Sequence, residues 1–244
     1  MVTIAPNNTE IIIIGSGIGG LCCGAMLARY GFEVIVCESH SLAGGAAHGF
    51  EKGGFNFDSG PSLYSGLSYS PSANPLRQVL DAIGEQLPCT TYDTWGCCLP
   101  EGDFDTSVGA SQFGEVLARL RGTAAVAEWQ QLQRVMEPYA QAATALPPLA
   151  LRFDLGAVFT LIGTPLTHQR FLRRHRGSYG PGIPAGRGLF PGPGTPLAGL
   201  YCCGDSTFPG IGLPAVAASG AIAANSIAPV HKHLEMLRSI RNLQ

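Results

Sequence analysis

A strand–helix–strand pattern near the start of the chain constrains the fold more than any other feature. It occupies residues 11–38, IIIIGSGIGGLCCGAMLARYGFEVIVCE. The continuous apolar runs at 10–14 and 32–37 predict buried strands of the kind found in parallel sheets, and residues 17–30 predict the helix between them. The pattern therefore predicts an α/β fold with a parallel, Rossmann-type sheet.

The glycines between the first strand and the helix indicate what this unit binds. Gly15 is expected to make the tight turn, Gly17 to let the backbone approach a pyrophosphate, and Gly20 to pack the helix on the strand. The helix N-terminus adds free amides and a partial positive charge. Glu38 ends the second strand, where an acid accepts hydrogen bonds from an adenosine ribose and repels a 2′-phosphate, which disfavours NADP. These residues predict a dinucleotide site.

Two further glycine motifs favour FAD over NAD. Gly44 and Gly45 follow the acid directly and are expected to bring backbone near the pyrophosphate a second time. Far along the chain, GLYCCGDSTFPGIGLPAVAASG repeats the order of strand, turn and helix, with Asp205 at the expected carboxyl end of a strand. The helix that follows Gly212 would present its amides to the flavin ring, and its positive end favours a reduced, anionic flavin. A site for NAD is not expected to use motifs from both ends of the chain, so this arrangement favours FAD.

The rest of the chain predicts helices, a hairpin and loops, and no second βαβ unit is visible between Gly45 and Pro196. The predicted elements are helices at 75–87, 111–121, 124–145 and 212–228, a hairpin at 90–108, a strand within 196–205, and a polar surface helix in the tail. Glycine-rich residues 40–66 and 177–194 predict loops. The sheet is therefore expected to be unusually small.

Composition narrows the classes of function. Only 13% of the residues are charged and the net charge is -2, which argues against a nucleic-acid partner. The opening residues, MVTIAPNNTE, do not resemble a secretory signal, and the isoleucine run is far below the roughly 20 residues that span a bilayer. We expect a cytoplasmic or plastid-stromal setting. The cysteines, mostly in adjacent pairs, are expected to be small buried hydrophobic residues rather than metal ligands or a redox dithiol.

Four segments carry a resemblance to a known family: GSGIGGLCCGAMLARYGFEVIVCESHSLAGGAAHGF, FNFDSGPSLYSGLS, GTPLTHQRFLRRHRGSYGP and GLYCCGDSTFPGIGLPAVAASG. Together they resemble carotenoid isomerases of the plant and cyanobacterial type, within the FAD-dependent phytoene desaturase group. The resemblance runs over nearly the whole chain. Such enzymes are far longer, however. In them a large middle region separates the segment similar to residues 124–161 from the segment similar to 163–180. In this chain the two segments abut near Leu161 and Ile162.

The resemblance implies an FAD cofactor, a long hydrophobic polyene substrate taken from a membrane, and a Rossmann-type FAD-binding sheet with a reduced α+β substrate region. It implies an FAD site made of Gly15, Ser16, Gly17, Ile18, Gly19, Gly20, Glu38, Ser39, Gly44, Gly45, Asp58, Ser59, Gly60, Gly204, Asp205, Gly212, Leu213, Pro214 and Val216. The predicted division is an FAD-binding βαβ segment at 1–66, a reduced substrate region at 67–195, a strand and helix completing the FAD site at 196–230, and a tail at 231–244. No metal ligand is expected.

Two functions fit these expectations. One is an FAD-dependent oxidoreductase or a redox-neutral cis–trans isomerase acting on a carotenoid-like polyene. The other is a non-catalytic FAD- or pigment-binding module derived by loss of the middle region. A general NAD-linked dehydrogenase is a weaker third, because the Gly44–Gly45 and Gly204–Asp205 motifs count against it. So small a sheet also makes the chain a candidate for pairing with a second copy.

Other residues carry weaker signals. His48, Asp58 and Tyr64 are candidates for acid–base groups, with solvated loop side chains as the alternative. The basic run at 170–176 follows the apolar run LGAVFTLIG at 155–163. This pairing suits peripheral contact with anionic lipid, for example at a photosynthetic membrane, or alternatively a solvated loop. The sequence identifies no catalytic residue.

Overall fold

The computed structural model of the chain describes residues 9–69, 72–100, 102–107, 109–143, 147–162 and 191–242. It divides into two compact units, one within residues 1–87 and 146–244 and the other within 88–145. The first unit unites both ends of the chain and carries all the glycine motifs. The division by role predicted from the sequence stays a prediction, and the basic run at 170–176 lies outside the described residues.

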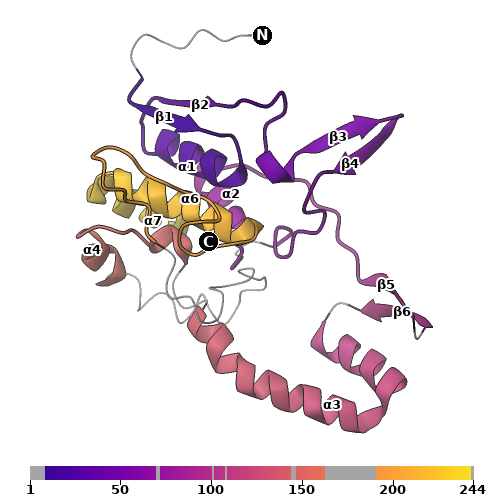
Figure 1. Cartoon of the computed structure of the whole chain (residues 1–244). Helices are drawn as coiled ribbons and strands as arrows, with labels where there is room; N and C mark the ends of the chain where they lie inside the picture. Colours follow the sequence, from indigo (N-terminus) through magenta and orange to yellow (C-terminus); the bar gives the residue numbers. More distant parts are fainter. Residues whose placement is uncertain are drawn as a thin grey trace. The chain divides into compact units, whose positions relative to one another are not determined.

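The predicted N-terminal βαβ unit is confirmed (Figure 1). It consists of β1 (Ile11–Ile14), α1 (Ile18–Arg29) and β2 (Val34–Cys37), and the two strands pair in parallel. Gly24 of α1 faces the sheet, and a Cβ there would lie 3.0 Å from Ile13 and 3.5 Å from Val36. The missing side chain at Gly24 thus lets the helix lie close on one face of the sheet.

The opposite face of this sheet is open in the part of the chain that the structure describes. Successive side chains of a strand point to opposite faces, so Ile12 and Ile14 point away from α1, and they are 64% and 89% exposed. Only β1 and β2 pair in this sheet among the described residues, as the small predicted sheet implied. A parallel sheet ordinarily has both faces covered, which makes this open face unusual.

The C-terminal part of the first unit consists of α6 (Leu213–Ile227) and α7 (Val230–Asn242). The strand predicted within 196–205 is wrong, because that stretch makes only an isolated bridge between Gly194 and Tyr201. A strand requires continuous pairing with a neighbour, whereas this segment bonds to residues shortly before it, where the Cys202 amide donates to the carbonyl oxygen of Pro193 at 2.8 Å. The tail is not purely a surface helix either, because His233 and Met236 of α7 are buried.

The contact between α1 and α6 depends on small residues. A Cβ at Gly220 would lie 2.2 Å from the carbonyl oxygen of Gly19 and 3.0 Å from Cβ of Cys22. At the other end of the contact, the Tyr30 hydroxyl donates to Oδ1 of Asn225 at 2.6 Å. Gly19, early in α1, also approaches Val216 in the first turn of α6, whereas Tyr30, just after α1, meets Asn225 near the end of α6. The two helices therefore run in the same direction.

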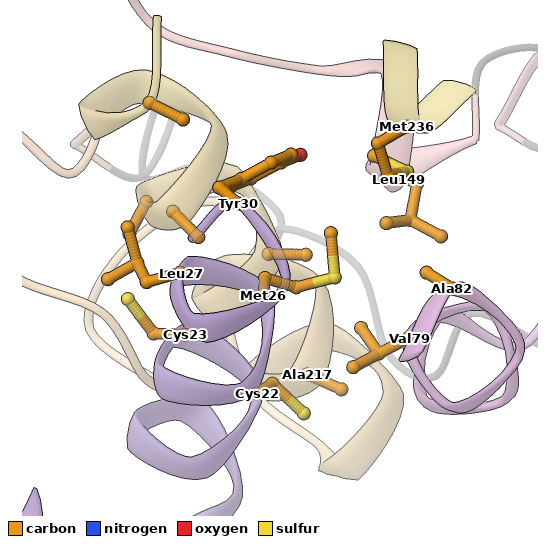
Figure 2. Packing of buried hydrophobic residues seen from close by; sticks show 14 of the residues in the cluster. Cys22, Cys23, Met26, Leu27, Tyr30, Val79, Ala82, Leu149, Ala217 and Met236 are labelled. Carbon is orange, nitrogen blue, oxygen red and sulfur yellow. The ribbon is translucent and has the colours of Figure 1, made fainter. Parts of the chain in front are cut away.

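The hydrophobic core forms around these two helices. Figure 2 shows Met26 of α1 between side chains that come from other parts of the first unit. Those parts are α2 (Pro75–Ile83) with Val79 and Ala82, η2 (Pro148–Ala150) with Leu149, α6 with Ala217, and α7 with Met236. The predicted helix at 75–87 ends earlier than expected, because Gly84 takes a left-handed conformation that terminates it.

A buried polar network fixes how these helices meet. Asn225, which is fully buried, donates through Nδ2 to the carbonyl oxygens of Leu149 and Leu151 at 3.0 and 2.8 Å. Nε2 of His233, also fully buried, lies 2.7 Å from the same Leu149 oxygen. Because apolar small-residue surfaces can slide past one another, these directional bonds select one register.

A hairpin replaces part of the loop predicted over 40–66. After the short η1 (Gly45–Ala47), strands β3 (Gly49–Lys52) and β4 (Phe55–Asp58) pair antiparallel. Gly53 and Gly54 join them with φ of 62° and 81°, the two positive values that a tight hairpin turn requires. The Gly53–Gly54 pair is the turn signal in the sequence, and the predicted loop did not include this hairpin.

The second unit contains the predicted hairpin, β5 (Thr94–Leu99) with β6 (Gly102–Ser107), and the long α3 (Ala110–Ala143). The two helices predicted there meet at Gly122, whose φ of 83° is not helical. In the first unit, α4 (Ala157–Ile162) is short. None of the helices described is long and apolar enough to cross a membrane.

The prediction of buried cysteines holds only for α1. Cys22 and Cys23 are buried there, whereas Cys37, Cys89, Cys98 and Cys202 are exposed and Cys97 and Cys203 are intermediate. Cys37 is exposed because it ends β2 on the uncovered face of the sheet. Burial of these side chains thus depends on neighbouring elements, which residue type alone does not reveal.

Replacing Gly220 by alanine tests the α1–α6 contact. We expect G220A to lower the free energy of unfolding of the first unit by about 1–3 kcal/mol, because the added methyl group meets backbone that must move. Urea unfolding followed by circular dichroism measures this. The control is G114A in α3, where a Cβ has open space; equal stability of G220A and the parent protein would contradict the contact.

His233 makes the stability of the first unit depend on pH. Burial is the main reason that its pKa is lowered to about 4, against an ordinary value of 6.5. Between these values the unfolded state binds more protons, so the free energy of unfolding falls as the pH drops from 6.5 to 4, by at most about 3 kcal/mol. Unfolding curves at several pH values should show this loss. It should be smaller in H233Q and unchanged in H231Q, whose histidine is exposed.

Candidate dinucleotide-binding site

The loop between β1 and α1 leaves open space beside its backbone. Gly15 has a φ of 97°, in the left-handed region that favours glycine, and a Cβ at Gly15 or Gly17 would meet no atom within 4 Å. Gly20 differs, because a Cβ there would lie 2.3 Å from the carbonyl oxygen of Gly15. The first two glycines therefore border a space that a ligand can fill, and Gly20 permits the turn itself.

Glu38 is held beside this loop by three donors. Its Oε2 accepts hydrogen bonds from the Ser16 hydroxyl at 2.6 Å and the Ser16 amide at 2.7 Å. Its Oε1 accepts from the His40 amide at 2.8 Å. The Ser16 hydroxyl, followed by the amides of His40 and Ser16, lowers the pKa of Glu38 to about 2. The carboxylate is thus ionised and oriented. Oε2 already accepts two close bonds, so a further donor such as a ribose hydroxyl would bond to Oε1, which accepts only one close bond.

The Gly44–Gly45 motif lies directly on the first glycine loop. The Gly44 amide donates to the Ser16 carbonyl oxygen at 2.9 Å. A Cβ at Gly45 would lie 2.9 Å from Cα of Gly17, and both Gly44 and Gly45 have positive φ. No other residue type fits this close approach of two backbones. The structure therefore brings the second predicted glycine motif to the first.

The base of the β3–β4 hairpin completes this side of the site. The Ser59 amide donates to the carbonyl oxygen of His48 at 3.0 Å, and a Cβ at Gly60 would lie 2.2 Å from the Ala46 carbonyl oxygen. His48 is anchored in turn, with Nδ1 2.7 Å from the Gly45 carbonyl oxygen. The predicted segment Asp58–Gly60 is thus connected through residues 45–48 to the glycine loop.

The C-terminal motif reaches the same loop from the other end of the chain. Cα of Gly204 lies 3.3 Å from the position that a Cβ of Gly19 would take, and Val216 lies 3.2 Å from it. The Gly204 amide donates to Oγ of Ser219 at 3.0 Å, and the Thr207 hydroxyl donates to the Gly204 carbonyl oxygen at 3.0 Å. Sequence reasoning missed Ser219 and Thr207, whose only signal is a polar side chain within a run of small residues.

Two helix N-termini meet at this site. α1 begins after Gly17 and α6 begins after Gly212, which has a φ of 104°. Because the helices run in the same direction, both unpaired sets of amides and both partial positive charges lie at the same end. The first turns of the two helices carry no acidic residue. The arrangement suits an anionic ligand that contacts both helices.

The predicted site residues are therefore brought together in large part. Leu213 and Pro214 form the first turn of α6, Ile18 begins α1, and Ser39 lies next to Glu38 with its hydroxyl 3.5 Å from Oε1. Asp205 follows Gly204 and is exposed. Among the suggested acid–base groups, burial, followed by the Asp58 carboxylate, raises the pKa of Tyr64. As ligand-binding residues, all of these stay predictions.

A family model described as an NAD(P)-binding Rossmann-like domain matches residues 13–82. Together with the βαβ unit, this match shows that the N-terminal region is a Rossmann-like, dinucleotide-binding region. Chloroplastic prolycopene isomerase from Arabidopsis thaliana is 51% identical over 73 residues, which are 29% of this chain and 12% of that protein. All-trans-retinol 13,14-reductase from Danio rerio is 41% identical over 78 residues, which are 32% of this chain and 12% of that protein. The Homo sapiens reductase is 47% identical over 80 residues, which are 33% of this chain and 13% of that protein.

The N-terminal region is thus homologous to part of these isomerases and reductases, and the resemblance seen in the sequence is confirmed for this region. The matches span only about an eighth of the relatives' own length. Among solved structures, a CLA-producing fatty acid isomerase from P. acnes gives a TM-score of 0.37 at 19% identity, over 68% of this chain and 37% of that one. That likeness is too low to support an argument.

The hydrogen bonds to Glu38 can be tested by removing the Ser16 hydroxyl. In S16A the pKa of Glu38 should rise from about 2 toward its ordinary value of 4.5, because the largest cause of its lowering is lost. Carbon-detected NMR titration of the side-chain carboxyl measures this. S39A, which removes only a hydroxyl at 3.5 Å, is the matched control. An unchanged titration in S16A would contradict the geometry.

Proposed function

We propose that the chain binds FAD between the βαβ unit and α6 and takes part in redox or isomerisation chemistry on a conjugated polyene. The observation that carries the cofactor proposal is the convergence of backbone from both chain ends. Gly17, Gly45 and Gly204 all lie at or beside the start of α1, and α6 begins at the same end. A mononucleotide would use only the first of these segments, whereas FAD has two parts to be held.

The residues present fit this cofactor. The open space at Gly15 and Gly17, which a Cβ would fill, is where the pyrophosphate would lie against the N-terminus of α1. The oriented carboxylate of Glu38 would accept from the adenosine ribose. The start of α6 and the Gly204 turn would then face the flavin ring. When bound, FAD supplies the electron-transfer chemistry, and the chain binds and orients it.

The substrate proposal rests on the homologous region. The relatives are named for prolycopene and all-trans-retinol, both conjugated polyenes. We extend that substrate class to this chain as a proposal, together with peripheral contact with a membrane, from which so apolar a substrate would be drawn. The exposed apolar side chains of Leu155, Val158 and Phe159, at and just before α4, support such contact.

A non-catalytic FAD-binding module is the second candidate, and the open sheet face favours it. Ile12 and Ile14 are exposed to solvent in the described part of the structure, and the region that matches the relatives is a small fraction of each relative's length. The two candidates differ in turnover. Reduced, FAD-loaded protein given a cis-polyene in lipid should change the cis–trans ratio if it is an isomerase, and should leave it unchanged if it is a binding module.

Cofactor binding is tested by filling the space at Gly17. Purified protein should show flavin absorption bands after incubation with FAD, and G17A should bind FAD at least roughly tenfold more weakly, about 1.4 kcal/mol. The backbone of Gly17, with φ of -64° and ψ of 166°, accepts alanine without strain, so the fold should be kept. Titration of flavin fluorescence measures the affinity.

The control for this test is G194A, another glycine beside open space. It should bind FAD as tightly as the parent protein. The cofactor proposal would be overturned by a parent protein that takes up no FAD, or by a G17A variant of unchanged affinity.

A further inference from the structure

The two faces of the β3–β4 hairpin differ sharply in chemistry. Because Phe50 pairs with Phe57 and Lys52 with Phe55, these four side chains share one face. The other face carries Glu51, Asn56 and Asp58 together with Gly49. The three phenylalanines are 40%, 70% and 45% exposed in chain order. Apolar side chains that gather on one exposed face are typical of surfaces that contact a ligand or a partner.

The rings form a row along that face. Phe50 and Phe57 stack with centroids 5.4 Å apart and planes 17° apart. The ring centroid of His48 lies 6.4 Å from that of Phe50, and the ring centroid of His40 lies 5.4 Å from that of His48. The row therefore passes through four rings from two loops and two strands, each within the range of direct ring contact. Such a row offers a narrow, elongated surface of ring faces and edges.

The row begins at the candidate dinucleotide site. The His40 amide donates to Glu38 and Nδ1 of His48 lies 2.7 Å from the carbonyl oxygen of Gly45. Gly45 in turn rests on Gly17. The only charged side chain on this face of the two strands, Lys52, is at the far end, beside the turn. An apolar ligand lying along the rings would thus reach the dinucleotide site at one end and meet a cation at the other.

We propose that the aromatic face of the β3–β4 hairpin binds the substrate, an extended conjugated hydrocarbon chain that lies along the ring row. This inference rests on the proposed function and adds the surface that holds the polyene. A flat conjugated chain stacks on phenylalanine rings as well as burying them, whereas a saturated chain of equal length gains from burial alone. The lysine at the far end suits a chain that ends in a hydroxyl or another oxygen group.

The experiment uses the full chain with all-trans-retinol as the probe and retinol fluorescence as the readout, with and without FAD. We expect the double variant F50L/F57L to bind retinol at least roughly tenfold more weakly, about 1.4 kcal/mol, because leucine keeps much of the apolar area but has no ring. F55L tests the same face without touching the Phe50–Phe57 pair that supports the hairpin, and should also weaken binding. The matched control on the other face is N56A, which should bind as the parent protein does.

The outcomes separate this inference from the proposed function. Flavin absorption should be unchanged in the leucine variants, which shows an intact cofactor site. Retinol binding that is equal in all variants, or displaced equally well by hexadecanol, would overturn the polyene surface while leaving FAD binding in place. The polyene surface would also be overturned if the leucine variants still bound retinol as the parent does and lost only their binding to phosphatidylcholine vesicles, or only their self-association measured by light scattering. A protein without flavin bands that still binds retinol in this pattern would keep the surface and refute the cofactor.

Discussion

The first unit depends on the close contact between α1 and α6, helices that lie almost two hundred residues apart in the chain. Gly220 allows this contact, since any side chain there would strike the carbonyl oxygen of Gly19. Close packing of parallel helices puts their N-termini together and places Gly204 beside the start of α1. The proposed site that both chain ends would share therefore depends on the glycines at this contact.

Small residues bring helices close, but they do not fix how far one slides along the other. Here directional bonds do so: Tyr30 bonds to Asn225, and Asn225 and His233 share the carbonyl oxygen of Leu149. All three polar side chains are buried, so leaving any one of them unpaired would cost the desolvation of that group. The network therefore acts on the site at a distance, by holding the helix ends in position.

The two halves of the proposed function stand on different parts of the molecule. The cofactor half rests on backbone: glycine loops, helix ends and one carboxylate held by Ser16. The substrate half rests on exposed apolar surface, above all the aromatic face of the β3–β4 hairpin. The two meet at residues 45–48, where the hairpin base lies on the glycine loop. A chain that matches only a small part of its relatives thus still presents both kinds of surface side by side.

The sequence by itself determined the βαβ unit, its glycine loop, the acid after β2 and the helix at Leu213–Ile227, because each depends on local periodicity or on a backbone conformation that only glycine adopts. Tertiary structure decided what depends on distant neighbours. It replaced the strand expected within 196–205 by an isolated bridge to Gly194, buried His233 in a tail expected at the surface, and gave Ser219 its role on the Gly204 amide. Those outcomes follow from long-range hydrogen bonds and burial, which no short stretch of sequence encodes.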